Sequence, residues 1–462
     1  MPPLHLSASP SLPLDILYQN HITFWGFLFP LISSLYHSPY RVAGRELLVG
    51  YYSLFFYTWG AGTGPFGRPG VEFQGSDSTL DYCNVTVTYA HPEKDDAVHA
   101  TVWLPFRNWN NRLQGSGGVG YAMRSEDPVL AAAVAQNYTV IATDGDHDLN
   151  RWSSKSRSLD ASGNVNTTLL EDFAYVALGD AATIGKQIAA SFYGRAPQYS
   201  YRSGCSTGGR QGLMLAQRYP TAYNGIMAAA PAINWPGFLV AEFWSQFVMT
   251  QLQAFPPACD LDAITAATIR ACDDIDGVVD GVISAPDLCG FDPRTLGTPL
   301  SMGESSLVRN VCSTSLNCTG VPFAISVDWI SQIVLQDPSF DFTTLDHKAL
   351  EEIFTRSKDT YNKVIGTEQY YKLVEEKDPS VRDFYRFFEA PGVYHCRGGA
   401  GPVPIGPLGH MVDWVENGIA PETGDALAAD GRRRGLCPYT LVSVYRGGDV
   451  KDATNYRCEE MF

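Results

Sequence analysis

Apolar and polar residues alternate along the first half of the chain in a way that predicts strands separated by helices. Residues 100–104 and 138–142 are runs of β-branched and aromatic residues that end in proline or Asp-Gly turns, as strands of a central sheet do. Residues 171–193 carry apolar side chains at three- and four-residue spacing, which predicts a helix with one face on that sheet. Those apolar positions are Phe173, Val176, Ala177, Ala181, Ile184 and Ile188.

The alternation continues with a strand at 198–202, a helix that ends at Arg218 and a further apolar strand at 225–229. Neighbouring parallel strands need a crossover connection, and a helix between successive strands supplies one. We therefore predict an α/β fold with a mostly parallel sheet.

The pattern changes after Pro231. Cysteines, Asp and Gly turns and short amphipathic pieces run to about residue 342 without clear alternation, and the core-like pattern returns from Tyr385. We interpret the middle part as a lid inserted into the core. The predicted parts are an atypical N-terminal leader or extension at 1–72, the first part of the core at 73–232, the lid at 233–344 and the second part of the core at 345–462.

Residues 1–72 fit a secretory leader poorly, because no Lys or Arg precedes Arg41 and Pro30 interrupts the apolar stretch at 22–36. A signal peptide has a basic start and a small-residue cleavage site. The stretch is also too short for a confident membrane span, so we expect no stable membrane insertion. We draw no function from these residues.

Composition narrows the class of protein. The 462 residues are 45% hydrophobic, enough for a sizeable core, and 49 acidic against 33 basic side chains give a net charge of −16. Such acidity argues against nucleic acid or an anionic membrane as the partner. Ten cysteines and four N-x-S/T sequons favour a secretory route, and so predict a secreted glycoprotein with disulfides. The sequons lie at Asn84, Asn137, Asn166 and Asn317.

The most informative segment is the turn Gly204-Cys205-Ser206-Thr207-Gly208, which lies between an apolar strand-like run and a helical run. A Gly-x-Ser-x-Gly turn in that context is the nucleophile elbow of an α/β-hydrolase. The glycines matter because the strained turn brings neighbouring backbone so close that a Cβ would clash. In a chain with 43 glycines the bare pattern also arises by chance, and the flanking strand and helix favour the elbow.

A serine nucleophile needs a histidine to accept its proton and a carboxylate to orient that histidine. In this fold the three follow the chain order Ser, Asp, His. Three histidines lie downstream of Ser206, namely His347, His395 and His410, and His395 alone follows a strand-like run into a glycine-rich loop. We predict His395 as the base, and the alternative is a loop histidine without a partner.

Cysteines adjoin both candidates, because Cys205 precedes Ser206 and Cys396 follows His395. A disulfide between them could lock two catalytic loops from distant parts of the chain at working distance. The alternative is a pair of free, buried cysteines.

A Cys-Ser elbow together with a His-Cys loop, in a chain with sequons, resembles the tannase and feruloyl esterase family. The resemblance covers roughly residues 80–458 and includes several further motifs. The matching segments are Trp109-Asn110, Gly117-Gly118, Thr143-Asp144-Gly145, 390–396, 414–418 and Cys437-Pro438-Tyr439. It implies an α/β-hydrolase with an inserted lid that hydrolyses phenolic carboxylic esters.

The resemblance also implies roles for individual residues. A hydroxycinnamoyl or galloyl ester would acylate Ser206, and His395 would protonate the departing alcohol. Backbone N–H groups of Thr207 and of the 115–120 loop, with Gly118 as our choice, would hold the oxyanion. The glycines of that loop have the alternative role of a simple turn.

An acidic, glycine-punctuated loop at 272–281 has the carboxylates that a hard cation such as calcium prefers, although it lacks the EF-hand spacing. The resemblance implies a lid calcium site, and the alternative is a solvated acidic turn. Its ligands would be side-chain oxygens of Asp273, Asp276 and Asp280 and the carbonyls of Val278 and Val282. The cysteines expected to staple the lid and the tail are Cys259, Cys272 and Cys289, and Cys437 with Cys458.

The third member of the triad departs from the family pattern. The acid should follow a core strand between the lid and His395, yet the periodicity at 348–358 and 366–376 favours helices. In the family, an Ile-Gly-Thr like that at 365–367 is followed by a strand and a His-Gly-x-x-Asp turn, and here it runs directly into the second helix. We interpret the core strand and its aspartate as missing, and Asp359 is the alternative acid by spacing.

The sequence therefore predicts a secreted serine ester hydrolase with a calcium- and disulfide-stabilised lid. Feruloyl esters of plant cell-wall polysaccharides are the first choice of substrate, and galloyl esters are the alternative within the same chemistry. A catalytically impaired or non-catalytic relic that has lost the acid is the alternative from another class.

Overall fold

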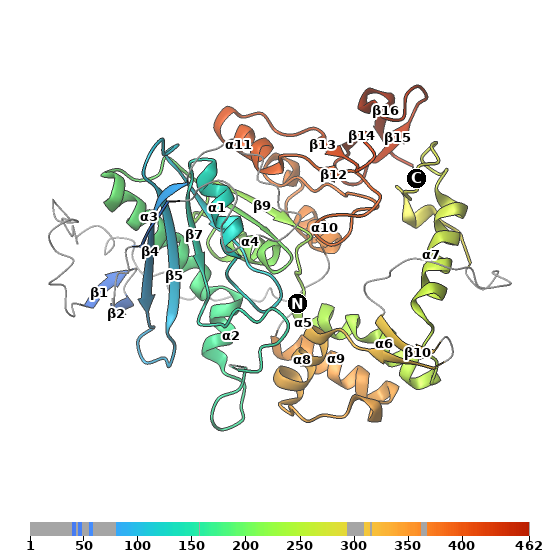
Figure 1. The fold of residues 1–462 in the computed structure, drawn as a ribbon, viewed down its shortest axis with the longest axis horizontal. Coiled ribbons are helices and arrows are strands. Elements are labelled where there is room, and N and C mark those ends of the chain that lie inside the picture. The colour runs from blue at the N-terminus through green and yellow to red at the C-terminus, as the bar shows by residue number, and fades with distance from the viewer. Residues whose placement is uncertain are drawn as a thin grey trace, which may run out of the picture.

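A seven-stranded sheet forms the centre of the molecule, and helices cover both of its faces (Figure 1). The computed structural model describes residues 39–42, 45–48, 55–58, 80–156, 158–292, 309–314, 317–361 and 367–461. The sheet has the order β3-β4-β5-β7-β6-β8-β9. Its strands are β3 (Phe55–Thr58), β4 (Asp81–Tyr89), β5 (Val98–Pro105), β6 (Arg112–Ser116), β7 (Thr139–Thr143), β8 (Tyr199–Cys205) and β9 (Gly225–Ala229).

Most of the predicted leader at 1–72 lies outside the described residues. Besides β3, its described part is an antiparallel hairpin, in which β1 (Pro39–Val42) pairs with β2 (Arg45–Leu48). β3 pairs antiparallel with β4 at one edge of the central sheet. These three short strands indicate no function for the predicted leader.

The sheet has a parallel half and an antiparallel half. β7, β6, β8 and β9 are parallel neighbours, whereas β3, β4, β5 and β7 pair antiparallel. In the parallel half, Cys205 at the end of β8 pairs with Ala229 at the end of β9. Because parallel strands end at one common edge, the residue after Cys205 emerges at the carboxyl edge, where α/β proteins carry their sites.

Side chains alternate between the two faces of the sheet and so create two cores. On β5, Val102 and Leu104 pack with α2 (Thr167–Ala174), α3 (Val176–Tyr193) and α4 (Thr207–Arg218). Trp103, between them, joins the core on the other face with α1 (Asp127–Ala135) and α11 (Pro407–Asn417). The segment predicted as one helix at 171–193 contains a break. Tyr175 adopts an extended φ of −159° between α2 and α3, so the segment belongs to two helices.

The residues predicted as the lid form a mostly helical layer beside the sheet (Figure 1). Its helices are α5 (Trp235–Glu242), α6 (Trp244–Leu252), α7 (Ala258–Cys272), α8 (Ala324–Asp328), a π-helix (Trp329–Leu335) and α9 (His347–Tyr361), beside the hairpin of β10 (Arg309–Thr314) and β11 (Asn317–Val321). Ser357 on α9 accepts a hydrogen bond from Trp329 at 2.9 Å and donates to the Pro236 carbonyl at 2.7 Å. This packing extends the helical layer beyond the predicted lid boundary at residue 344.

The last part of the chain forms small separate sheets. β12 (Val403–Pro404), β13 (Gly424–Leu427) and β14 (Arg433–Leu436) make one sheet, and β15 (Val442–Tyr445) pairs with β16 (Tyr456–Glu459). Within the described ranges, no strand after β9 joins the central sheet, so β9 lies at its edge. The remaining short elements are α10 (Thr367–Lys377) and the 3₁₀ turns Pro286–Leu288, Phe342–Thr344, Val381–Asp383 and Ala453–Asn455.

Four disulfides cross-link the chain, and they differ widely in the length of chain that they close. Cys205–Cys396 spans 191 residues, whereas the three others span 17, 21 and 6 residues. These three are Cys272–Cys289, Cys437–Cys458 and Cys312–Cys318. The expected bridge at Cys259 is wrong: Cys259 is a free thiol, because Cys289 takes Cys272 as its partner. Cys83 is free and buried.

No helix among the described residues is long and apolar enough to cross a membrane.

Candidate active site

Ser206 lies at a sharp turn between β8 and α4. Its backbone has φ 61° and ψ −122°, a left-handed conformation that side chains other than glycine rarely adopt. The turn is fastened at both sides, because the Ser206 N–H donates to the Ala229 carbonyl at 3.1 Å and its own carbonyl accepts from Arg210 at 3.0 Å. This strained strand-to-helix turn is the geometry of a nucleophile elbow.

The glycines around the turn are required by close backbone approach. A Cβ on Gly204 would lie 2.7 Å from the backbone of Gly208, and one on Gly208 would lie 3.1 Å from the backbone of Gly117. The first contact is shorter than real Cβ atoms make, so the backbone would have to move. The elbow and the 115–120 loop therefore pack as one unit.

The Cys205–Cys396 disulfide brings His395 to the elbow. The Cα atoms of the two cysteines are 5.9 Å apart, so Ser206 and His395 each lie next to the same bridge. The segment that leads to His395 is not the strand that its sequence predicts. Its described contacts are isolated bridges, Phe388 to Pro438 and Val393 to Gly399, because a turn at 391–392 interrupts the extended backbone.

The His395 side chain is exposed, yet the protein around it lowers the pKa of its imidazole below the ordinary value through desolvation. Within the described part of the chain, no carboxylate bonds to this imidazole, and no hydrogen bond joins it to the Ser206 hydroxyl. Asp359, the alternative acid, falls in α9, and its side chain lies outside the described residues. The structure thus brings together two of the three expected groups.

Gly118, the predicted oxyanion donor, already has an acceptor for its N–H group in this structure. Its N–H donates to the buried Gln211 side chain at 3.2 Å, so it points to α4 and is already occupied. Thr207 is fully buried at the first position of α4, where helix N–H groups lack partners, and its hydroxyl donates to the Gly120 carbonyl at 2.6 Å. Val119 and Tyr121 also use their N–H groups, and the Gly120 N–H has no acceptor among the described residues.

Two buried arginines, which the sequence pattern did not predict, flank the elbow. Arg202 on β8 donates to the Ser116 carbonyl at 2.8 Å and to Gln211 at 2.6 Å. Arg210 on α4 stacks on Phe173 and donates to its carbonyl at 3.0 Å. Burial, and then the nearby Arg202, lowers the pKa of Arg210 to about 9. The sequence does contain an indication of them, because each is a charged residue at a position of β8 or α4 where an apolar residue is expected.

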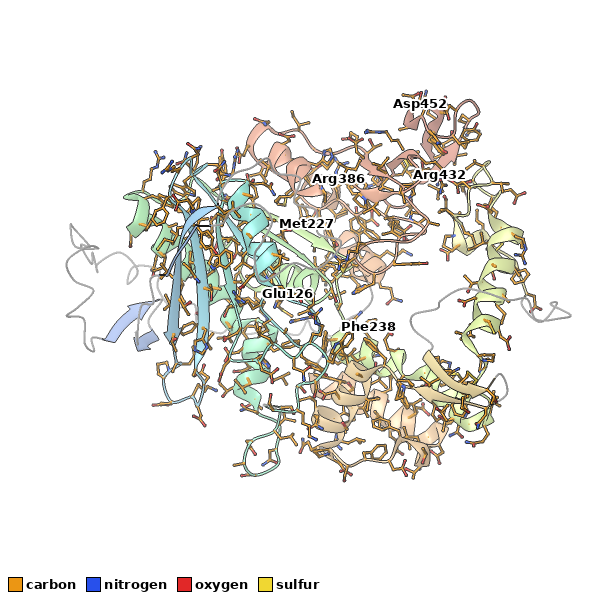
Figure 2. All side chains as sticks on the ribbon, viewed as in Figure 1. Glu126, Met227, Phe238, Arg386, Arg432 and Asp452 are labelled. Atoms are coloured by element: carbon orange, nitrogen blue, oxygen red, sulfur yellow. A yellow bond between two sulfur atoms is a disulfide. The ribbon has the colours of Figure 1, made fainter. Side chains whose placement is uncertain are left out.

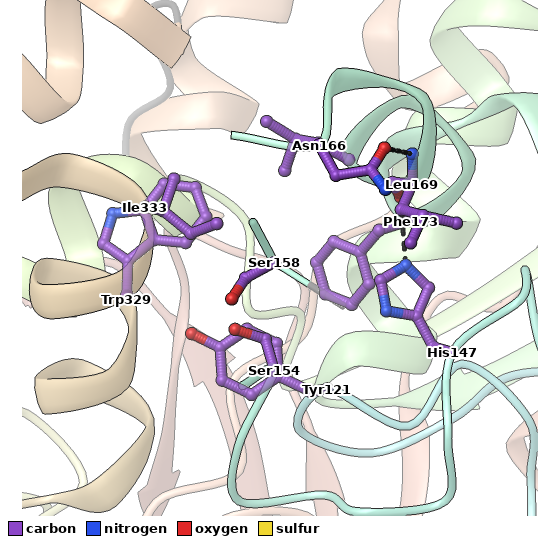
Figure 3. Close-up of a pocket in the computed structure, with 10 residues that line it drawn as sticks. Tyr121, His147, Ser154, Ser158, Asn166, Leu169, Phe173, Trp329 and Ile333 are labelled. Atoms are coloured by element: carbon purple, nitrogen blue, oxygen red, sulfur yellow. Dashed lines mark hydrogen bonds between the residues drawn. The ribbon is translucent and has the colours of Figure 1, made fainter. Parts of the chain in front are cut away.

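A small cavity lies between the core and the helical layer (Figure 3). Tyr121, next to Gly120, forms part of its wall, and the Tyr121 hydroxyl donates to the Ile325 carbonyl at 3.2 Å. His147 donates to the Leu169 carbonyl, and burial lowers the pKa of this imidazole. The wall is mostly apolar and carries a few hydroxyl groups. The residues that line it are Tyr121, His147, Ser154, Ser158, Asn166, Leu169, Leu170, Phe173, Trp329 and Ile333.

The predicted calcium loop follows α7, and its carboxylates already have protein partners. Asp273 accepts backbone N–H groups from Asp280 and Val282, at 3.1 and 3.0 Å. Arg434 bonds to Asp276 at 3.1 Å and to Asp280 at 2.7 Å. Figure 2 shows the neighbouring Arg432, which immediately precedes β14, and this residue also pairs with Asp280.

The donor set of this loop nevertheless fits a hard cation. Three carboxylates, two of them buried, alternate with the backbone carbonyls of Val278 and Val282 in one short segment. Desolvation raises the pKa of Asp276, as it does for a carboxylate whose charge is incompletely compensated. Asp273, Asp276 and Asp280 with the two carbonyls would hold the ion, which would brace the lid.

The comparison with protein families decides the identity of the fold and its chemistry. A family model described as tannase and feruloyl esterase matches residues 83–320 and 341–459. The chain belongs to this family. Its members are carboxylic ester hydrolases, which agrees with the strained Ser206 turn and the adjacent disulfide.

Individual tannase and feruloyl esterase relatives cover most of the chain. A "Probable feruloyl esterase" of Arthroderma benhamiae is 34% identical over 84% of this chain and 87% of the relative. Feruloyl esterase B of Aspergillus niger is 28% identical over 82% of this chain and 87% of its own length. The alignment with the Arthroderma protein has 467 positions but takes in only 84% of 462 residues, so parts of that relative have no counterpart here.

Solved structures share the fold. Tannin acyl hydrolase of Aspergillus niger superposes with a TM-score of 0.73 at 25% identity, over 88% of this chain and 90% of that one. Feruloyl esterase B of Aspergillus oryzae gives a TM-score of 0.71 at 23% identity, over 91% of this chain and 98% of that one. The predicted α/β-hydrolase core and the family resemblance are both confirmed.

Proposed function

We propose that this chain hydrolyses esters of hydroxycinnamic acids, such as the feruloyl esters of plant cell-wall polysaccharides, through an acyl-enzyme on Ser206. The observation that carries the proposal is the Cys205–Cys396 disulfide, which places His395 beside a serine in a strained elbow. The names of the relatives support the feruloyl group over other acyl groups.

The reaction follows from the chemistry of the two side chains. The Ser206 hydroxyl attacks the ester carbonyl while the neutral His395 imidazole takes its proton. The tetrahedral intermediate collapses, and the imidazolium gives that proton to the departing alcohol. Water then attacks the acyl-serine with His395 again as base, which releases the carboxylic acid and restores Ser206.

The negative charge of the tetrahedral intermediate needs preorganised donors. We assign this role to the Thr207 N–H at the start of α4 and to the Gly120 N–H, in place of Gly118. The Thr207 hydroxyl donates to the Gly120 carbonyl at 2.6 Å, which ties the 115–120 loop to the start of α4. The buried positive charges of Arg202 and Arg210 favour the same oxyanion.

The absence of a carboxylate at His395 in the described residues favours a second candidate, a catalytically impaired esterase. Disabling the aspartate of a serine triad lowers kcat by about 10⁴-fold, because the imidazole loses its orientation and charge partner. Activity would then be slow but would still depend on Ser206. A protein with no hydrolytic function at all would show no such dependence.

The test is hydrolysis of methyl ferulate and methyl gallate by the purified chain and by Ser206→Ala. We expect turnover of methyl ferulate above that of methyl gallate, and its loss in the variant. Equal rates for the chain and Ser206→Ala would contradict the esterase, and faster release of gallate would make it a tannase. Transcript sequencing across the codons for 355–371 would show whether a strand with an aspartate belongs there.

We also propose that the protein is secreted and that calcium binds the loop after α7. Four disulfides support the first proposal, because such bonds persist in oxidising compartments. The carboxylate and carbonyl donor set supports the second. After chelation, adding back Ca²⁺ alone should raise the melting temperature of the parent chain and not that of Asp276→Asn, and unchanged melting of the parent would count against the calcium.

A further inference from the structure

A second cluster of ionisable side chains lies at the same edge of the sheet as Ser206 but away from it. His91 and Asp96 belong to the turn between β4 and β5, Asp172 to α2 and Asp180 to α3. β7 and β6 separate β5 from β8, so this cluster is not part of the ester site. His91, Asp96 and Asp172 are all buried, with at most 8% of each residue exposed.

The three buried residues direct one ligand atom each toward a common point. The Nδ1 atom of His91 lies against a carboxylate oxygen of Asp96 and 3.8 Å from an oxygen of Asp172. All three candidate ligand atoms lie within 4.8 Å of one another. In the described part of the chain, this is the one group of three such side chains that meets this criterion.

The other ring nitrogen of His91 has the partner that a metal-binding histidine usually has. Its Nε2 atom lies 2.7 Å from a carboxylate oxygen of Asp180. Metal-binding histidines commonly donate their second N–H to a carboxylate, which fixes the tautomer and turns the free nitrogen toward the metal. The backbone also fixes Asp96, because the His91 N–H donates to its other oxygen at 2.8 Å.

Asp172 supplies an independent indication of a ligand site. The residue is 1% exposed, and its Oδ2 atom has no hydrogen-bond partner. A buried carboxylate oxygen without a donor is costly, because the charge loses water and gains nothing in return.

We propose that His91 Nδ1, Asp96 and Asp172 bind a divalent transition-metal ion, for which zinc is the best match, with Asp180 as the positioning residue for His91. One imidazole nitrogen and two carboxylates suit zinc, whereas calcium and magnesium favour sites made of oxygen alone. Two positive charges would also compensate the buried carboxylates.

The site would be structural. It would fasten α2 to the β4–β5 turn, and Asp172 precedes Phe173, which lines the cavity beneath the helical layer.

The experiment loads the full chain with Zn²⁺, removes excess metal by dialysis and measures the zinc content and the melting temperature. We expect one zinc per chain and a melting temperature about 2–5 °C above that of the chelated protein. Co²⁺ in place of Zn²⁺ should give the visible absorption of a low-coordinate site. A chain without bound zinc, unchanged in melting, would overturn the proposal.

Asp172→Asn separates the metal site from a merely structural network. The variant keeps the shape of the side chain but removes the unsatisfied charge, so without metal it should melt at or above the parent. With Zn²⁺ the variant should bind no metal and its melting temperature should not rise. The parent, which binds zinc, should then melt above the variant. Asp273→Asn, in the calcium loop, should keep the full zinc response. Equal zinc binding by Asp172→Asn and the parent would overturn the assignment.

Discussion

The two sides of the proposed ester site, Ser206 and His395, are built in opposite ways. Ser206 follows β8, which pairs with β6 on one side and β9 on the other, and the glycine contacts leave its turn no room to move. His395 lies in an exposed loop that belongs to none of the described sheets. One side is therefore preorganised by the sheet, whereas the other depends on its attachments.

Those attachments can be named. The chain before His395 packs its aromatic side chains on α10, where the rings of Tyr371 and Tyr385 lie 5.1 Å apart. The Cys205–Cys396 bridge then fixes the loop to the elbow. Since no described strand continues the sheet beyond β9, the disulfide does for the histidine what a neighbouring strand would otherwise do. The difference shows that one catalytic side can be ready while the other is only tethered.

Breaking the tether should have the largest effect. In Cys205→Ser/Cys396→Ser we expect Ser206-dependent turnover to fall at least about 100-fold, because a 1 Å displacement of catalytic groups already costs that much. Stability should fall by about 2–5 kcal/mol, because the bridge closes a loop of 191 residues. Urea unfolding and methyl ferulate turnover measure the two effects.

The matched control is Cys312→Ser/Cys318→Ser, which removes a bridge that closes only six residues in the β10–β11 hairpin. A short loop loses little entropy when it closes, so this variant should keep nearly full activity and most of the stability. If both double variants lose turnover equally, the tether has no special role at the site.

The sequence predicted the sheet side of this comparison well and the tethered side poorly. The predicted strands at 100–104 and 225–229 lie within β5 and β9, and the one at 198–202 overlaps β8, because each is a compact apolar run flanked by turn residues. The run before His395 has similar composition, yet it forms isolated bridges instead of a strand. Local pattern cannot show whether a sheet edge is available to pair with.

Side-chain partners show the same limit. The adjacency of cysteines to Ser206 and His395 was enough to suggest a bridge, because both lie next to chemically special residues. The occupation of the Gly118 N–H by Gln211 depends on a contact 93 positions away in sequence, and no periodicity reveals it. The free thiol of Cys259 likewise follows from three-dimensional pairing, which cysteine spacing leaves open.

The next largest effect, on stability, should come from a charged contact that joins α11 in the last part of the chain to the central sheet. Glu416 on α11 accepts from Arg112 on β6 at 2.6 and 2.7 Å and from the Tyr201 hydroxyl on β8 at 2.6 Å. Only 15% of its side chain is exposed. We expect Glu416→Gln to lose about 2 kcal/mol of unfolding free energy at pH 7, because its three charge-assisted hydrogen bonds weaken.

The pH dependence of this loss follows from the pKa of Glu416, which the hydrogen bond from Arg112 holds below its ordinary value of 4.5. A lowered pKa gives stability that is complete above the unfolded value and is lost as the pH falls through the folded one. The gap between parent and variant should therefore close below about pH 4. The exposed Arg386–Glu422 pair is the control, and Glu422→Gln should change stability by less than about 0.5 kcal/mol.

The smallest effect is the sharpest test of the base side. Desolvation lowers the pKa of His395 below 6.5, and the imidazole must be neutral to accept the serine proton. The value of kcat/KM should therefore rise with pH along a single limb whose midpoint lies below 6.5, with a plateau at neutral pH. A pH profile of methyl ferulate hydrolysis measures this midpoint.

A carboxylate hydrogen-bonded to His395 would shift the midpoint the other way, because it stabilises the imidazolium. A limb with its midpoint above 6.5 would therefore reveal an acid at the site and contradict the tethered, two-residue arrangement. His410→Gln is the control, since this residue lies on α11 and should leave the profile unchanged. The direction of the shift thus decides whether the histidine side of the site is held by the disulfide alone or by a complete triad.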